Sequence, residues 1–122
     1  MSKNDELKRI HTELRENVPD ISGVMIASNE GLSISTDFPE EEAVRVAAVS
    51  AAASGLGGRI ASNAALGETQ EVMVKGRDGL MLIYLAGPRG VLAVRASARG
   101  NLGLVRLEAS AAAAEVTRIL NM

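Results

Sequence analysis

The amino-acid sequence predicts a single α+β domain, residues 1–122, in which a five-stranded antiparallel sheet is covered by helices on both faces. Two observations lead to this expectation. The hydrophobic periodicity changes along the chain in the order α-β-β-α-β-β-β-α, without an internal repeat or a linker. Two strand segments, 24–27 and 80–86, are apolar at consecutive positions, which is typical of strands buried on both faces. Such strands need helices above and below the sheet.

The first helix and the first hairpin have clear local signals. The hydroxyl of Ser2 and the carboxylate of Asp5 are spaced as in a capping box at a helix start. The apolar side chains that follow at helical spacing are Leu7, Ile10, Leu14 and Val18. Segments 21–28 and 32–36 indicate two strands, joined by a loop in which Gly31 is free to adopt a positive φ angle. Apolar and polar residues alternate in 32–36, so this strand is expected at an edge of the sheet.

The second half of the chain predicts three strands and a helix. The strands are expected at Glu71–Lys75, which is short, at Leu80–Ala86, and at Val91–Arg95, which completes the sheet. Asn101 is positioned to cap a final helix at 102–120. The stripe of this helix that is expected to face the sheet consists of Val105, Ala109, Ala112, Val116 and Ile119.

The long helix between Pro39 and Asn63 is the most informative element, because it carries no charge between Arg45 and Arg59. A surface helix keeps one polar face toward water, so this helix is expected to be covered on more than one side. The larger side chains, which we expect on the sheet, are Val46, Val49, Ala53, Leu56 and Ile60. The small residues, which we expect to admit the same helix of a second copy, are Ala47, Ser50, Ala51, Ser54, Gly55 and Gly58.

Composition argues against several function classes. Phe38 and Tyr84 are the only aromatic residues, the net charge is −2, and there is no basic block, so nucleic-acid binding has little support. The absence of cysteine excludes thiol chemistry and agrees with a reducing, cytoplasmic location. The longest uncharged run, 46–58, is shorter than the about 20 apolar residues that span a bilayer, so no membrane insertion is expected.

Candidate chemistry is sparse, and we expect no catalytic residue, metal or cofactor. His11 is the only histidine and has no metal-ligand partner at suitable spacing, so it is expected to face solvent. The glutamates at 40–42 compensate the dipole of the long helix and lack the spacing of a calcium loop. The glycines at 55–58 fall late in a helix, whereas a phosphate cradle needs them at a helix start. Either the helix approaches another element closely there, or it ends at Gly57.

Three features together resemble the Roadblock / dynein light chain family. They are the segment VMIASNEGL at 24–32, the alanine-rich long helix, and a Gly-Pro-x-Gly turn within 80–94, in an order that covers the chain from Leu7 to Leu120. The resemblance implies the profilin-like roadblock fold and a homodimer with adjacent long helices and paired third strands. Bacterial and archaeal members commonly accompany small Ras-like GTPases and regulate or tether them. Eukaryotic relatives are adaptors in dynein motors and GTPase scaffolds.

The resemblance also implies where this chain makes its contacts. The dimer interface is expected at Ala47, Ala51, Gly55, Gly58, Val72 and Val74. The rim that touches a partner is expected at Arg45, Ser50, Ser54 and Arg59. The expected function is a non-catalytic, homodimeric regulator or effector platform for a small Ras-like GTPase. The alternatives are a structural adaptor that ignores nucleotide state and, less favoured, a profilin-like small-molecule sensor, for which the apolar strands lack convergent polar residues.

Overall fold

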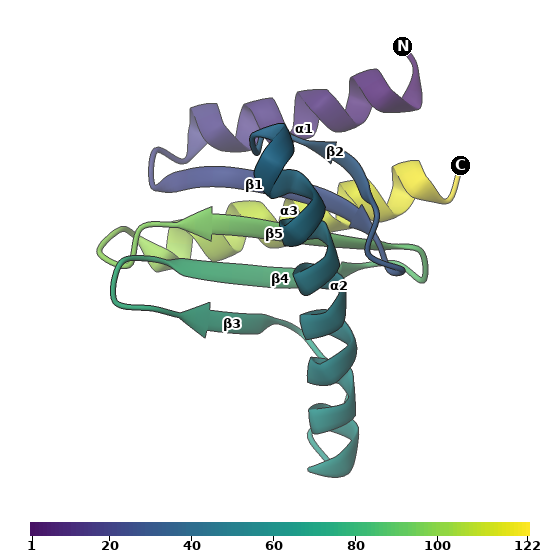
Figure 1. Cartoon of the computed structure of the whole chain (residues 1–122), viewed down its shortest axis with the longest axis vertical. Helices are drawn as coiled ribbons and strands as arrows, with labels where there is room; N and C mark the ends of the chain where they lie inside the picture. Colours follow the sequence, from purple (N-terminus) through teal and green to yellow (C-terminus); the bar gives the residue numbers. More distant parts are fainter.

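Every predicted helix and strand is present in the predicted order in the computed structural model, which describes residues 1–122 (Figure 1). The elements are α1 (Lys3–Asn17), β1 (Ile21–Ser28), β2 (Ser33–Thr36), α2 (Glu40–Asn63), β3 (Val72–Lys75), β4 (Leu80–Ala86), β5 (Gly90–Ala96) and α3 (Leu102–Leu120). Helix α2 ends at Asn63, as predicted, and the alternative end at Gly57 is wrong. Pro39 is the N-cap of α2, with ψ at 145°, and the bounds of β2, β3 and β5 differ from the predicted ones by one residue.

The five strands form one antiparallel sheet in the order β2-β1-β5-β4-β3. The last strand in sequence, β5, therefore completes the sheet from its centre, where Val94 is paired with Val24 on one side and with Leu82 on the other. The two edges are β2 and β3, each of four residues. The prediction of β2 as an edge strand is confirmed.

The two faces of the sheet are covered by different helices. Helices α1 and α3 lie together on one face, over a core of 20 buried residues (Figure 1). Helix α2 crosses the other face, over a smaller core of 8 buried residues. The predicted apolar stripes of α1 and α3 are confirmed, since every residue in them is buried. No helix combines the length and the apolar character that crossing a membrane requires.

Local signals act as predicted at three places. At the start of α1, the Ser2 hydroxyl accepts from the Asp5 amide at 3.1 Å, and the Asp5 carboxylate accepts from the Ser2 amide at 3.3 Å. The Asn101 side chain caps α3 by accepting from the Leu104 amide at 3.1 Å. Gly31 adopts a φ of +97° in the β1–β2 loop, a conformation that favours glycine.

The predicted orientation of α2 is wrong for three of the five larger side chains, whereas Val46 and Ala53 do pack against the core beneath the helix. The residues of α2 that are buried against the sheet are Ala43, Ala47, Ser50, Ser54 and Ala61. Of the large stripe expected there, Val49, Leu56 and Ile60 are exposed. The reason is space: on this face the sheet itself supplies Met25 and Ile83, so only small side chains fit beneath the helix.

Helix α2 is also longer than the sheet is wide at this point. Its 24 residues span about 36 Å, and its last turns extend past β3, where no strand of the chain lies beneath them (Figure 1). The helix crosses β3 at Gly57, where an added Cβ atom would overlap the Cγ2 atom of Val72. A close helix–strand approach, one of the two alternatives for the glycines, is therefore the reason for Gly57.

Candidate functional site

Several exposed aliphatic side chains lie on α2. Val49, Leu56 and Ile60 have exposed fractions of 62%, 59% and 55%, and Ala53, half-buried, lies between them. These four residues follow the spacing i, i+4, i+7 and i+11, so they share one side of the helix. We call them the outer stripe. A row of exposed aliphatic side chains on a small domain marks an interaction site.

The edge strand β3 continues this surface. Val74 pairs with Met81 and Val72 with Ile83, and both partners belong to the core beneath α2, so the two valines lie on the α2 side of the sheet. Val74 has an exposed fraction of 56%. The outward side of the β3 backbone has no strand partner. An exposed apolar edge strand is a template for pairing with another chain.

A groove joins the outer stripe to the β3 edge. It has a volume of about 540 Å³ and lies between the last turns of α2, the α2–β3 loop and β3. Ile60 of the outer stripe, Leu66 of the loop and Val72 contribute apolar side chains to it. The groove, the outer stripe and β3 therefore form one continuous surface.

The start of β3 is fixed by the carboxylate of Glu71. Its Oε1 atom accepts from the Tyr84 hydroxyl at 2.9 Å, and its two oxygens accept from the Arg106 Nε and Nη2 atoms, both at 3.0 Å. Burial, together with the hydrogen bond to Glu71, raises the pKa of Tyr84, so this phenol stays protonated. Glu71 thus attaches the edge strand to β4 and to α3.

Only some of the residues expected at the dimer interface lie on this surface. Val72 and Val74 lie on it, Gly58 is half-buried beside Thr69, and Gly55 is exposed with open space around it. Ala51 is half-buried, on the side of α2 that faces Gly31. Ala47 is fully buried against the sheet, so the prediction that it forms an intermolecular contact is wrong.

The expected partner rim is also divided. Arg45 and Arg59 are exposed, and the Arg45 guanidinium donates to the Glu41 carbonyl at 3.2 Å. Ser50 and Ser54 have exposed fractions of only 1% and 7%, so their prediction as an exposed rim is wrong. They lie under the helix for the same reason as Ala47, because the sheet leaves room only for small side chains. The Ser50 hydroxyl has no hydrogen-bond partner there.

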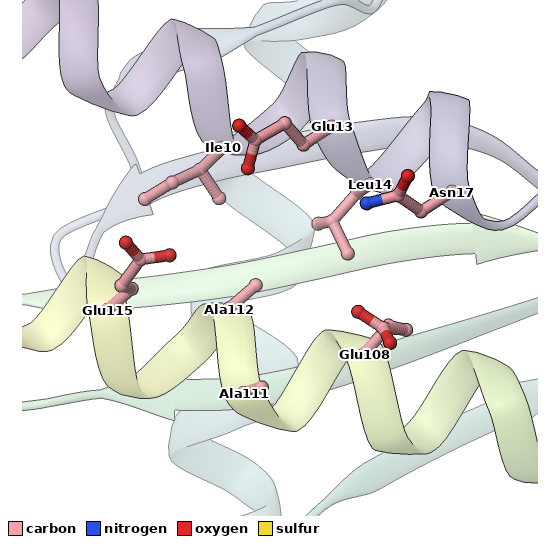
Figure 2. Close-up of a pocket in the computed structure, with 8 residues that line it drawn as sticks. All are labelled: Ile10, Glu13, Leu14, Asn17, Glu108, Ala111, Ala112 and Glu115. Atoms are coloured by element: carbon pink, nitrogen blue, oxygen red, sulfur yellow. The ribbon is translucent and has the colours of Figure 1, made fainter.

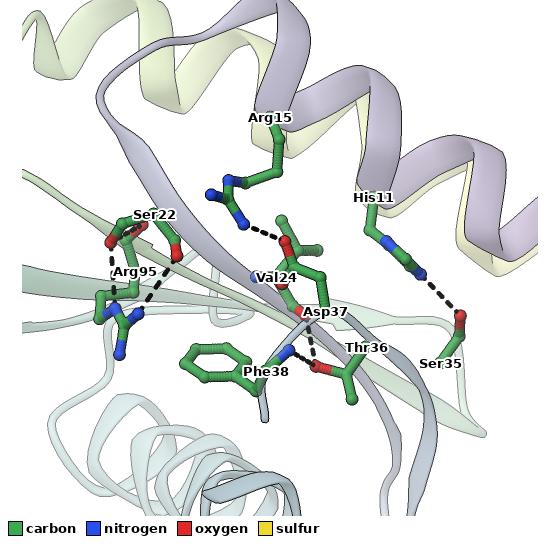
Figure 3. Close-up of polar contacts among 9 residues, drawn as sticks. All are labelled: His11, Arg15, Ser22, Val24, Ser35, Thr36, Asp37, Phe38 and Arg95. Carbon is green, nitrogen blue, oxygen red and sulfur yellow. Dashed lines mark hydrogen bonds and ion pairs between the residues drawn. The ribbon is translucent and has the colours of Figure 1, made fainter. Parts of the chain in front are cut away.

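His11 is a further residue that sequence patterns misplaced. It is buried, not exposed to solvent, and its Nε2 atom lies 3.1 Å from the Ser35 hydroxyl (Figure 3). Burial lowers the pKa of His11, which favours the neutral ring. The nearby Asp37 carboxylate contacts Arg15 and accepts from the Val24 amide at 2.8 Å; it makes no hydrogen bond to the histidine. A serine–histidine pair without an orienting carboxylate is a structural contact between α1 and β2.

A small hollow between α1 and α3 carries three carboxylates (Figure 2). It has a volume of about 100 Å³, with Glu13, Glu108 and Glu115 around the apolar side chains of Ile10 and Leu14. The Arg9 guanidinium donates to Glu13 at 3.0 Å and to Glu115 at 3.1 Å. No cluster of three or more acidic or imidazole side chains is arranged to hold a metal ion. The hollow is therefore an ion-paired seam between two helices.

Sequence reasoning missed Leu56, Val49 and Ile60 as surface residues and did not consider Glu71. One signal was available for the first three. The outer stripe contains no charged residue, so it needs an apolar cover. The other two helices each have a single apolar stripe, which packs on the sheet, so the chain has no helix to cover the outer stripe. The Glu71 contacts had no signal, because Tyr84 and Arg106 are 13 and 35 residues away in sequence.

Solved structures share this fold along nearly the whole chain. A Roadblock/LC7 domain from Streptomyces avermitilis has a TM-score of 0.88 at 21% identity, with 94% of this chain and 98% of that chain covered. The gliding protein MglB from Thermus thermophilus has a TM-score of 0.87 at 14% identity, with 99% and 93% covered. MglB from Myxococcus xanthus has a TM-score of 0.77 at 24% identity, with 98% and 94% covered.

Sequence comparison assigns the family. An uncharacterized protein of Methanocaldococcus jannaschii, MJ1340, is 34% identical over 97 residues, which are 79% of this chain and 84% of the relative. A second protein of that organism, MJ0310, has the same identity and coverage. Residues 7–96 match the family defined by the Roadblock/LC7 domain. The chain belongs to the Roadblock/LC7 domain family.

Proposed function

We propose that this protein is a non-catalytic, homodimeric regulator or effector platform for a small Ras-like GTPase. The observation that carries the first half of the proposal is the exposed outer stripe on a helix that extends past the sheet edge. The second half rests on what the Roadblock family resemblance implies, because its bacterial and archaeal members commonly accompany such GTPases.

The proposed dimer pairs β3 of one protomer with β3 of its partner in an antiparallel arrangement. The end of α2 that extends past β3 then lies over the partner's sheet, beside the partner's α2. In this arrangement the outer stripe, and not the small residues beneath α2, forms the contact between helices. Burial of these aliphatic side chains against the partner stabilises the dimer by about 25 cal/mol for each Å² of apolar surface. Ala51, Gly55 and Gly58 remain predictions for the opposite side of α2.

The proposed GTPase surface is the side of α2 that points away from the sheet. Arg45 and Arg59 are exposed there, with exposed Ala52 between them. Two helices side by side present an apolar strip with an arginine near each end. Such a surface suits a partner with an apolar centre and acidic rim, since charges at a rim steer association and apolar centres supply affinity.

The test is affinity capture with the dimer as bait, run in GDP and in a non-hydrolysable GTP analogue, followed by mass spectrometry. We expect a Ras-like GTPase to be enriched in one nucleotide state. The double variant Arg45→Glu, Arg59→Glu should stay dimeric, because neither residue is in the outer stripe, and should lose the GTPase. Capture of a protein independently of nucleotide would favour a structural adaptor, and the absence of a GTPase in both samples would contradict the proposal.

A further inference from the structure

The second edge of the sheet carries a groove that the proposed dimer leaves free. It has a volume of about 430 Å³ and lies between α1 and β2. The strand β2 pairs with β1 on one side, and its other side has no strand partner. Of its side chains, Ser33 and Ile34 are exposed. A free strand edge beside an open groove is the geometry in which a partner adds an extended segment to a sheet.

The side chains that line this groove are polar and carry no acid. They are Asn4, Lys8 and His11 from α1 and Ser33, Ser35 and Thr36 from β2, together with Ile34. The three α1 residues follow the spacing i, i+4 and i+7, so they form one ridge along the groove. Thr36 and Ser35 are engaged with the Val24 carbonyl and with His11, so the donors that the groove offers to an anionic group are the Asn4 amide, the Lys8 ammonium and the Ser33 hydroxyl.

Lys8 gives the groove its charge. The Lys8 ammonium makes no ion pair and no hydrogen bond within the chain. The Asp37 carboxylate, which lies near His11, is already engaged by the Arg15 guanidinium and the Val24 amide (Figure 3). An unpaired cation in a groove without carboxylates favours an acidic ligand.

A second copy of this chain is a poor occupant of the groove. Two β2 edges in contact would bring the Lys8 ridge of each copy toward that of the other, and like charges at an interface oppose association. A bulge between Ile26 and Ala27 also interrupts the β1–β2 register and limits the regular edge to a few residues. Such a bulge discourages indiscriminate pairing. The β2 edge therefore suits a short segment whose charge is opposite to that of Lys8.

We propose that the groove between α1 and β2 binds an extended acidic segment of a partner protein, which pairs with the β2 edge and places a carboxylate beside Lys8. The segment spans about four residues, or about 13 Å. The site is on the opposite edge from β3, so it stands independently of the proposed dimer and of the GTPase surface.

The test is an NMR titration of the ¹⁵N-labelled protein with two synthetic peptides, Thr-Val-Glu-Val-Glu-Val-Thr and the version with lysine in place of glutamate. We expect the acidic peptide to shift the amides of residues 33–36, Lys8 and His11, and to bind about tenfold more tightly than the lysine peptide. Lys8→Glu should reverse this preference. Lys75→Glu, on the β3 edge, is the matched control and should leave it unchanged.

Four results would overturn the proposal: equal binding of the two peptides, no binding of the acidic peptide, shifts confined to β3, or an unaltered preference in Lys8→Glu. Lys8 is exposed on α1, so its substitution leaves the core intact. The unchanged dispersion of the remaining amide signals verifies the fold of each variant. A failure here leaves the nucleotide-dependent capture untouched, because that experiment depends on Arg45 and Arg59.

Discussion

The two edge strands have equal length and opposite surroundings. At β3, Met73 and Val74 are exposed and the apolar end of α2 extends past the strand. At β2, serine and threonine predominate, and the polar ridge of α1 lies alongside. The two edges therefore differ in the helix that lies beside them, and this difference is the basis of the two proposals. The apolar end of α2 suits β3 for a second copy, and the unpaired Lys8 of α1 suits β2 for an acidic segment.

The largest expected effect is on dimerisation, which should respond to a substitution near β3 and not to one on β2. Leu56→Asp should raise the dissociation constant of the proposed dimer by about 100-fold or more, because it places a carboxylate in the centre of the helix–helix contact. The fold should persist, since Leu56 is exposed within the protomer. Ile34→Asp on β2 is the control and should not change the dissociation constant. Analytical ultracentrifugation measures both, and a monomeric wild type would contradict the proposed dimer.

A pair of glycine substitutions tests how closely α2 lies on β3. Gly57→Ala should lower the free energy of unfolding by about 1–3 kcal/mol, because the new Cβ atom overlaps Val72 and β-branched side chains yield little. Gly55→Ala should raise it by up to about 1 kcal/mol, because the site is open and alanine favours helix. Urea unfolding at one protein concentration measures both. If Gly55→Ala instead weakens the dimer, the original prediction of Gly55 as an intermolecular contact is supported.

Two carboxylates attach the edges to the rest of the fold, and their removal should have different consequences. Glu71→Gln breaks a charge-assisted contact to Arg106 at the start of β3, and Asp37→Asn weakens the contact of the β2 end with Arg15. Each should cost about 1–2 kcal/mol of unfolding free energy. Only Glu71→Gln should also weaken the dimer, because only β3 is expected to pair. Equal dimer affinity in both variants would show that the β3 edge needs no such support.

The sequence predicted α1, α3 and the strands well because each of these has one interpretable pattern. The stripes of α1 and α3 are apolar on one side only, and β4 is apolar throughout, as an interior strand of a sheet requires. Helix α2 is apolar on both sides, so periodicity could identify two stripes but not assign them. The assignment depends on Met25 and Ile83, which fill the space under the helix and are far from it in sequence.

The site was less predictable than the fold, for the same physical reason. Val72 and Val74 lie on an edge strand, in agreement with what the resemblance implies, and their contact with a second copy stays a prediction. Ser50, Ser54 and Ala47 were misplaced because small size alone does not distinguish contact with a sheet from contact with a second helix. The burial of His11 depends on Ser35, which comes 24 residues later in the chain.

The smallest expected effect concerns pH and the β2 edge. The pKa of His11 is lowered in the folded chain by burial, against the raising effect of Asp37 and with the lowering effect of Lys8. The unfolded chain therefore binds more protons than the native chain as pH falls below about 6.5, so stability declines from there toward lower pH. His11→Gln keeps a polar side chain near Ser35 and removes this titration.

Urea unfolding of wild type and His11→Gln at pH 7.5 and 5.5 measures the effect. The loss of unfolding free energy between the two pH values should be larger in the wild type, because only its native state must exclude a proton from this side chain. Equal losses in the two proteins would show that His11 protonates freely in the fold, which would require the contact between α1 and Ser35 to open at little cost. The β2 edge would then be as mobile as an unsupported strand, and the groove beside it would not be preformed.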